Sequence, residues 1–159
     1  MRNLKISKLR VPHLSERHAY ILITAENWWN RRCVQSKAGK MFQAFVRHGF
    51  AGPLQAELLL FYVKNPVREL RGKAEFVERI AGNPEELWNK YGNETVFENY
   101  GEYKEFLGDQ TKTTFIRFKN LQELEKPKPL KFLLEKLGGS MLARSGKYIN
   151  KELANTLTT

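Results

Sequence analysis

The apolar positions of the chain are densest in its middle, over residues 56–80. Leu58–Val63 is an unbroken run of six large apolar residues, which is typical of a strand that is buried on both faces. Asn65 and Pro66 follow two positions later. Because proline fixes its own φ and keeps the preceding residue out of the α region, the chain is predicted to turn there.

A return strand is predicted from Arg71 onward, where polar and apolar residues roughly alternate. Gly72 inside this alternation predicts a β-bulge or a close approach of another part of the chain to the backbone. We expect the hairpin of residues 56–80 to be the spine of a small barrel. It is interpreted mainly as scaffold, with Tyr62 as its best candidate for reaching a pocket.

Two further segments have the composition of strands. Residues 20–24 read Tyr-Ile-Leu-Ile-Thr, and residues 111–118 are rich in Thr, Phe and Ile. Strands and helices do not alternate regularly along the chain, which argues against a doubly wound parallel sheet. The sequence therefore predicts an α+β fold, a small mixed β-barrel surrounded by short helices.

The first helix is predicted to begin near Ala25, with Thr24 as its N-cap and Glu26 in the first turn, where a negative charge suits the helix dipole. A second helix is predicted over residues 40–48, because Met41, Ala44 and Phe45 recur at helical spacing and Gly49 is a natural stop.

The second half of the chain carries clearer helix signals. Asn83 and Pro84 have the residue types of an N-cap and a first helical position, and Gly92 of a helix end. Further short helices are predicted over residues 102–107 and 130–137 and from Lys151 onward. Residues 126–129 contain two prolines and are predicted to break the regular structure.

A chain of 159 residues is most simply one domain. We expect residues 1–18 to form a basic N-terminal arm or a peripheral segment, and residues 19–159 a single domain. The longest apolar run has six residues, against the roughly 18 that a membrane-spanning helix needs, so a soluble protein is predicted. The first apolar segment, from Tyr20, is too short for a secretory signal, so we expect the protein in the cytoplasm. The one cysteine, Cys33, rules out an internal disulfide and is interpreted as a small buried hydrophobic residue.

The net charge of +10 favours polyanionic partners such as nucleic acids. The charge is unevenly distributed: residues 26–50 hold five Lys or Arg against one Glu, residues 111–151 hold ten against three, and residues 64–110 hold seven against ten acidic groups. This pattern predicts a basic side and a mildly acidic side. A merely solvated charged face is the alternative. The many Lys and Glu residues also suggest a thermophilic source.

Several classes of chemistry find no support in the sequence. Neither the Walker pattern nor the dinucleotide fingerprint occurs, which disfavours nucleotide triphosphate chemistry. His13, His18 and His48 lack metal-ligand spacing, and a single aspartate, Asp109, makes a paired-aspartate hydrolase implausible. No metal and no cofactor are expected.

Two tryptophans, Trp28 and Trp29, follow the first predicted strand directly. Adjacent residues on a helix point about 100° apart, so one ring can enter the core while the other stays near the surface. One hypothesis is that the outer ring stacks on a base of single-stranded nucleic acid. The alternative, that both rings only pack, stays open. The nearby basic residues that would contact phosphates are Arg31, Arg32, Lys37, Lys40 and Arg47.

A second basic stretch near the C-terminus carries Arg144, Ser145 and Lys147 around a glycine. Its backbone and hydroxyl donors have the chemistry to meet a base edge or a phosphate, and a plain surface turn is the alternative. The functional surface is expected where residues 24–47 meet residues 140–148.

The order of these features resembles the PUA-like superfamily, and within it a family of small uncharacterised archaeal proteins near the EVE and ASCH domains. The segments that carry the resemblance are Tyr-Ile-Leu-Ile-Thr with the two tryptophans, Leu-Leu-Phe-Tyr-Val, Gly-Lys-Ala-Glu-Phe-Val-Glu, Thr-Thr-Phe-Ile-Arg-Phe and Arg-Ser-Gly-Lys-Tyr-Ile. The resemblance implies a PUA-like pseudo-barrel whose cleft binds RNA or an extruded modified base.

By the same resemblance, the pocket is expected near Thr24, Trp28 or Trp29, Tyr62 and the loop of Arg144 and Ser145. The Gly-x-Lys signature of ASCH domains is not reproduced. Gly39 and Lys40 are adjacent, and no Glu lies between Lys40 and Arg47. This departure counts against an ASCH-type amide-hydrolysing activity.

The sequence thus favours a non-catalytic module that binds RNA (tRNA, rRNA or single-stranded RNA) or a modified nucleobase, as a monomer or weak homodimer. The alternative is a small hydrolase of nucleoside or nucleobase derivatives that uses Lys40 with Tyr62 or Glu75. A basic protein-interaction module is the third possibility.

Overall fold

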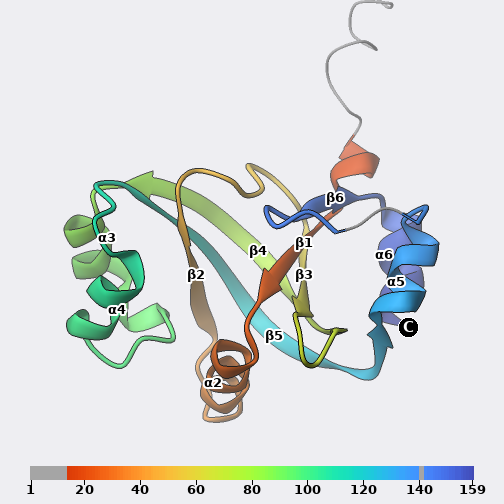
Figure 1. Cartoon of the computed structure of the whole chain (residues 1–159), viewed down its shortest axis with the longest axis horizontal. Coiled ribbons are helices and arrows are strands. Elements are labelled where there is room, and N and C mark those ends of the chain that lie inside the picture. The colour runs from red at the N-terminus through yellow and green to blue at the C-terminus, as the bar shows by residue number, and fades with distance from the viewer. Residues whose placement is uncertain (1–13, 140–141) are drawn as a thin grey trace, which may run out of the picture.

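The structure is a computed structural model of the chain and describes residues 14–139 and 142–159 (Figure 1). The strands are β1 (Ala19–Thr24), β2 (Phe42–His48), β3 (Leu58–Val63), β4 (Glu69–Gly82), β5 (Thr113–Pro129) and β6 (Lys147–Ile149). The α-helices are α2 (Glu26–Lys37), α3 (Pro84–Tyr91), α4 (Tyr100–Leu107), α5 (Leu130–Lys136) and α6 (Lys151–Thr158), and the 3₁₀ helices are η1 (Leu14–Arg17) and η2 (Gly92–Glu94).

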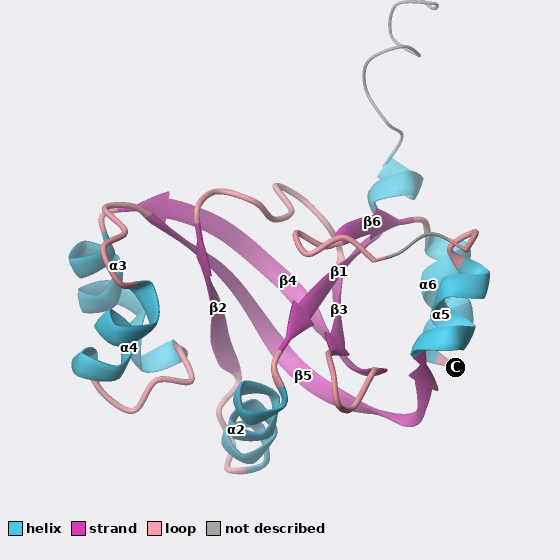
Figure 2. Cartoon of the chain, viewed as in Figure 1, coloured by secondary structure: helices cyan, strands magenta, loops and turns pink. Residues whose placement is uncertain are grey.

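The strands of the described residues form one six-stranded sheet in the order β2-β5-β4-β3-β1-β6. β1 and β3 pair in parallel and the other neighbours are antiparallel. The long strands β4 and β5 cross the molecule together, with α3 and α4 at one end and α5 and α6 at the other (Figures 1 and 2). The predicted mixed α+β architecture is confirmed.

Three apolar clusters fill the core. The first joins β1 and β3 to the C-terminal helices through Leu133 and Leu157, and the second holds Trp29 and Cys33 of α2 against β3 and β5. The third lies between β2, β5 and the helices α3 and α4. Cys33 is buried, as predicted, and burial raises the pKa of its thiol to about 12.

The predicted hairpin is confirmed. Leu58–Val63 is a central strand with five of its six residues buried, and the chain turns at Asn65 and Pro66 into β4. The pairing of β3 with β4 shifts by one residue between Phe61 and Tyr62, beside Gly72. The indole of Trp29 lies against this glycine: a Cβ added to Gly72 would stand 2.2 Å from Cη2 of Trp29. Gly72 therefore marks both a bulge and a close approach.

We expect Gly72→Ala to lower the free energy of unfolding by about 1–3 kcal/mol, the usual cost of overpacking a well-filled core. Gly82→Ala is the matched control on the same strand, because a Cβ there meets nothing within 4 Å. Urea denaturation of the two variants measures the difference. Equal stability of both would contradict the close packing of Trp29 on β4.

The helix predicted over residues 40–48 is wrong, because this segment is strand β2. It pairs with β5 in an unbroken antiparallel register from Phe42 opposite Lys119 to His48 opposite Thr113. Apolar residues at neighbouring positions fit a helical face and a strand equally well over so short a segment. The aromatic and β-branched residues of β2 then gain a full set of ladder hydrogen bonds as a strand.

The break predicted at residues 126–129 does not end the strand, since β5 continues to Pro129, which pairs with Glu69 of β4. The regular pairing is nevertheless interrupted here, because Leu70 pairs with Lys128 whereas Gly72 pairs with Glu123. On its other side β5 has β2 as a neighbour only up to Lys119. Beyond that residue β5 is an edge strand on this side, so a proline without an N–H group there costs no ladder bond.

Two helix caps differ in how well the sequence predicted them. The Asn83 side chain accepts from the backbone N–H groups of Glu85 and Glu86 and caps α3, as predicted. Thr24 does not cap α2: the N-cap is Ala25, and the Thr24 hydroxyl instead donates to the Ala25 carbonyl at 3.3 Å.

Strand β6 and helix η1 had no counterpart in the predictions. β6 is only three residues long, and it pairs with the edge of β1. η1 and His18 belong to the predicted N-terminal arm, and residues 1–13 of that arm, with His13, lie outside the described residues. Residues 140 and 141 of the predicted functional surface lie outside them as well. None of the described helices is long and apolar enough to cross a membrane.

Candidate functional site

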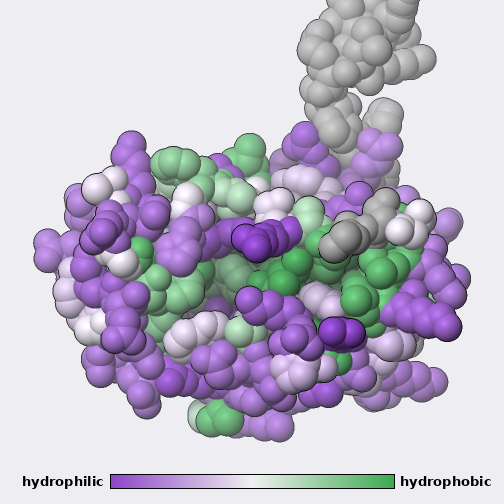
Figure 3. Space-filling view, in the orientation of Figure 1, coloured by the Kyte–Doolittle hydropathy of each residue, from purple (hydrophilic) through white to green (hydrophobic). Residues whose placement is uncertain are grey.

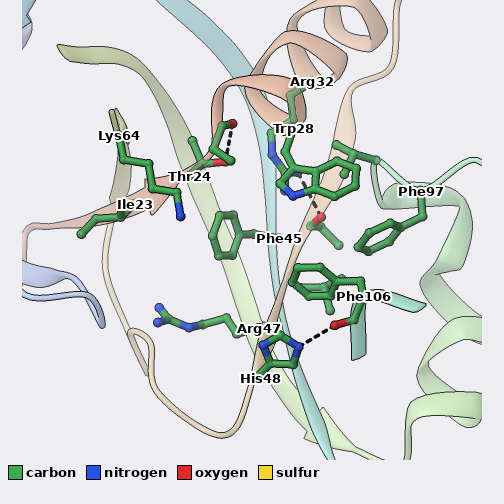
Figure 4. Close-up of a pocket in the computed structure, with 14 residues that line it drawn as sticks. Ile23, Thr24, Trp28, Arg32, Phe45, Arg47, His48, Lys64, Phe97 and Phe106 are labelled. Atoms are coloured by element: carbon green, nitrogen blue, oxygen red, sulfur yellow. Dashed lines mark hydrogen bonds between the residues drawn. The ribbon is translucent and has the colours of Figure 1, made fainter. Parts of the chain in front are cut away.

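A cleft of about 290 Å³ opens between the end of β1, the start of α2 and the strand β2 (Figure 4). β2 is one edge of the sheet, and β1 has no β6 partner beyond Ile21, so the cleft lies between two strands that do not pair with each other. In the space-filling view, hydrophobic residues are visible in the recessed middle of this face, with hydrophilic residues around them (Figure 3). The lining residues are Ile23, Thr24, Ala25, Trp28, Arg32, Ala44, Phe45, Val46, Arg47, His48, Lys64, Val96, Phe97 and Phe106.

One wall is built by the parallel pair β1 and β3. Because the two strands run in the same direction, their ends reach the same edge of the sheet, where Thr24 stands opposite Val63. The backbone N–H of Lys64 donates to the Thr24 carbonyl at 3.0 Å. The lysine side chain extends from this point toward the cavity in Figure 4.

Helix α2 presents its two tryptophans to different surroundings. Trp29 is 2% exposed and packs on Phe61 at a ring distance of 5.6 Å, whereas Trp28 is half-buried and lines the cleft. Trp28 meets the rings of Phe97 and Phe106 edge to face at 5.2 and 6.2 Å. The cleft thus has one aromatic wall with part of an indole open to it.

His48 extends this wall. Its ring stacks on Phe106 at 4.6 Å, and its Nε2 lies 2.7 Å from the Phe106 carbonyl oxygen. A carbonyl can only accept, so Nε2 carries the hydrogen of this bond and Nδ1 is the acceptor in the neutral ring. The imidazole is thereby fixed in orientation.

Strand β2 carries a cation that links the cleft to the loop before β6. The Arg47 guanidinium donates to the carbonyls of Ser145 at 3.1 Å and Arg144 at 3.4 Å. The hydroxyl of Tyr20 donates to the same Ser145 carbonyl. Burial lowers the pKa of Arg47. Residues 24–47 therefore meet residues 144–145, as the sequence predicted, through Arg47.

Arg32 lies at the inner end of the cleft and is 3% exposed. Its Nη1 donates to the Ala44 carbonyl at 3.1 Å, and its own carbonyl accepts from the Gln43 side chain at 3.2 Å. Burial lowers the pKa of Arg32 to about 9, which still leaves the guanidinium charged at neutral pH. Together with Arg47 and Lys64 it gives the cleft three cations, and no Asp or Glu of the described residues lines it.

The segment that supplies Val96 and Phe97 is held in place by ion pairs. Arg117 of β5 binds both carboxylate oxygens of Glu94 at 2.8 and 2.9 Å. Two of the predicted site residues hold the same segment by hydrogen bonds: Lys40 donates to the Thr95 carbonyl and Arg31 donates to the Val96 carbonyl, each at 3.2 Å.

Four of the predicted site residues come together in the cleft: Thr24, Trp28, Arg32 and Arg47. Trp29 is in the core, and Tyr62 is 6% exposed in the cluster that faces α5 and α6, so neither lines the cleft.

The remaining predicted residues lie around the cleft or away from it. Arg31 pairs with Glu102 at 2.7 Å and Lys37 with Glu123 at 3.3 Å. Arg144 and Ser145 contribute their carbonyls to Arg47, and Lys147 is exposed on β6. Of the groups considered for a hydrolase, Lys40, Tyr62 and Glu75 share no site, because Glu75 accepts from Asn120 on the exposed side of β4 and β5.

Nothing in the local sequence singles out five of the lining side chains: Phe45, His48, Lys64, Phe97 and Phe106. The sequence predicts a helix for Phe45 and His48, and Lys64 directly precedes the predicted turn at Asn65 and Pro66. Phe97 and Phe106 lie more than 70 positions after β1, so only the tertiary fold brings them to it. No group of three His, Cys, Asp or Glu residues within residues 14–139 and 142–159 is arranged to hold a metal ion.

No protein-family model and no curated protein sequence matches the chain. Among solved structures, the chain is similar to the ASCH protein from Zymomonas mobilis, with 21% identity, a TM-score of 0.73 and coverage of 91% of this chain and 98% of that chain. A serine-to-alanine mutant of the same protein matches with 22% identity, a TM-score of 0.72 and coverage of 89% and 95%. A tyrosine-to-phenylalanine mutant matches with 20% identity, a TM-score of 0.73 and coverage of 89% and 96%. These similarities confirm the predicted PUA-like pseudo-barrel fold.

Proposed function

We propose that this chain is a binding module for single-stranded RNA that takes one nucleotide into the cleft. The observation that carries the proposal is the lining itself, in which half-buried aromatic rings stand beside Arg32, Arg47 and Lys64 without a carboxylate. Aromatic faces accept bases of any sequence, and cations hold the phosphates. This combination is how unpaired nucleic acid is bound.

The size of the cleft supports one nucleotide as the occupant. Its volume of about 290 Å³ lies at the lower end of the range for small-molecule sites, which begins at roughly 300 Å³. A duplex has its bases stacked inward and offers no single base to such a cavity. The PUA-like fold that the chain shares with an ASCH protein is in keeping with RNA binding.

The proposal is tested by fluorescence polarisation with a labelled single-stranded RNA over a range of salt concentrations. Each phosphate that the cations neutralise adds roughly −0.7 to the slope of log Kobs against log salt, so binding is expected to weaken as the salt concentration rises. Duplex RNA of the same sequence is expected to bind more weakly. No binding of the single strand at low salt would refute the proposal.

In the same assay Trp28→Leu should weaken binding about tenfold, because one base–aromatic stack contributes about 1–3 kcal/mol. Trp88→Leu is the matched control. Both tryptophans are half-buried and pack on the same core cluster, but Trp88 does not line the cleft. If both variants bind alike, Trp28 has no stacking role.

A further inference from the structure

The guanidinium of Arg32 is a buried charge that the protein does not neutralise. Its side chain makes no ion pair within the described residues, and its Nε has no hydrogen-bond partner there. Its carbon Cζ lies 5.1 Å from the ring centre of Phe45 and 5.7 Å from that of Phe118. Arginine is almost never fully buried unless it is paired, because an unpaired charge loses its hydration without compensation.

The other charged groups that line the cleft add to this positive potential. Arg47 faces it from β2, and Lys64 faces it from the segment after β3 (Figure 4). Lys40 lies close enough that, after burial, the charge of Arg32 is the next cause that lowers its pKa. An anion at the inner end of the cleft would therefore be attracted from several elements at once.

We propose that the inner end of the cleft is a phosphate subsite centred on Arg32, which binds the phosphomonoester of a terminal nucleotide. This inference rests on the proposed function and narrows its ligand to a strand end or a free nucleotide that carries a terminal phosphate. The base then lies along Trp28, and the phosphate reaches Arg32 with Lys64 beside it.

The chemistry of the site favours a monoester over a diester. A monoester carries up to two negative charges, against one for a diester, and so offsets more of the three cations. A diester also continues the chain on both sides of the phosphate, whereas a terminal monoester continues it on one side only, which suits an inner end that lies against the buried Arg32. The planar guanidinium matches the oxygens of a phosphate in paired hydrogen bonds, which an ammonium group does not.

The test compares one short RNA in three forms, with a 5′-phosphate, with a 3′-phosphate and with hydroxyl groups at both ends. We expect a terminal phosphate to raise the affinity at least tenfold. Calorimetric titrations with a nucleoside 5′-monophosphate, the matching nucleoside and inorganic phosphate separate the free nucleotide from the strand end as the source of the group.

Variants connect the effect to Arg32. Arg32→Met should abolish the difference in affinity between phosphorylated and unphosphorylated ligands. Arg32→Lys keeps the positive charge but lacks the paired N–H donors of the guanidinium, so it should retain part of that difference. Arg71→Met is the matched control, because Arg71 pairs with Glu69 and does not line the cleft. It should bind every ligand as the unchanged protein does.

The outcomes separate this inference from the proposed function. If the three RNA forms bind equally well, the phosphate subsite is wrong while RNA binding stands. If the nucleoside monophosphate binds better than the nucleoside but no RNA binds, the subsite stands and the RNA function fails. If nothing binds, both fail.

Discussion

Trp29→Ala is expected to lower the free energy of unfolding by about 3–5 kcal/mol, the usual cost of removing a buried aromatic side chain from a core. Trp29 is 2% exposed, packs on Phe61, and fills the space above Gly72 where β4 bulges. It thus ties α2 to two neighbouring strands. Against a typical total stability of about 5–15 kcal/mol, this is a large loss, and urea denaturation measures it directly.

Two controls make this prediction specific. Trp28→Ala should cost clearly less, because that ring is only half-buried. Gly72→Ala should be better tolerated when Trp29 is already alanine, because the new methyl group then meets no indole. A double-mutant cycle that gives additive losses would show that the two residues are not coupled through this contact.

The part of the fold that the sequence predicts best is the part where local signals and tertiary packing agree. Leu58–Val63 is a strand because a run of six large apolar side chains needs burial on both faces, and the fold provides it. Helix α3 begins where Asn83 and Pro84 place it, because a cap acts through the next few backbone N–H groups alone.

The wrong predictions of secondary structure arise where a strand that is distant in the sequence determines the conformation of a segment. β2 is a strand because β5 pairs with it over its whole length, and β5 lies about 70 residues away. The prolines near the end of β5 are tolerated because β2 is no longer its neighbour beyond Lys119, and a proline is excluded from a strand only on a side where its missing N–H group would have donated to a neighbour. A window of ten residues therefore shows neither that residues 42–48 form a strand nor that β5 continues through its prolines.

The residues of the candidate site also fall into a group that local sequence signals can select and a group that only the tertiary fold brings to the cleft. Thr24, Trp28, Arg32 and Arg47 could be selected because aromatic and basic residues follow a predicted strand closely. The aromatic wall of Phe97 and Phe106 could not, because α4 reaches the cleft only through the packing of the third core cluster on β2. That Trp28 and not Trp29 lines the cleft depends on which face of α2 meets the sheet.

The buried guanidinium of Arg32 either binds a ligand or stabilises the fold, and the two roles have opposite effects on the stability of the free protein. A group that is kept unpaired for a ligand costs the free protein part of its stability, whereas a group that is kept for the fold adds to it. The two roles therefore predict opposite signs for the same substitution, which makes Arg32 the most informative single position in the chain.

Arg32→Met is expected to raise the free energy of unfolding by about 1–4 kcal/mol, the range seen when buried ion pairs are replaced by apolar side chains of similar volume, because Arg32 has the desolvation cost of a buried charge without a partner that offsets it. The substitution loses the hydrogen bond of Nη1 to the Ala44 carbonyl, worth about 1 kcal/mol, but removes the desolvation cost of the charge. Methionine is flexible enough to fill the space between Phe45 and Phe118. Denaturation in buffer free of phosphate and nucleotide measures the change.

The control is Arg71→Met, which breaks a partly exposed ion pair and should change the stability by less than about 1 kcal/mol. Added nucleoside monophosphate should then stabilise the unchanged protein and the Arg71 variant by mass action, but not the Arg32 variant. A marked loss of stability in Arg32→Met, with the ligand effect intact, would mean that the guanidinium serves the fold. A gain in stability together with loss of the ligand effect is expected only if the charge is held for an anion that comes from outside the chain.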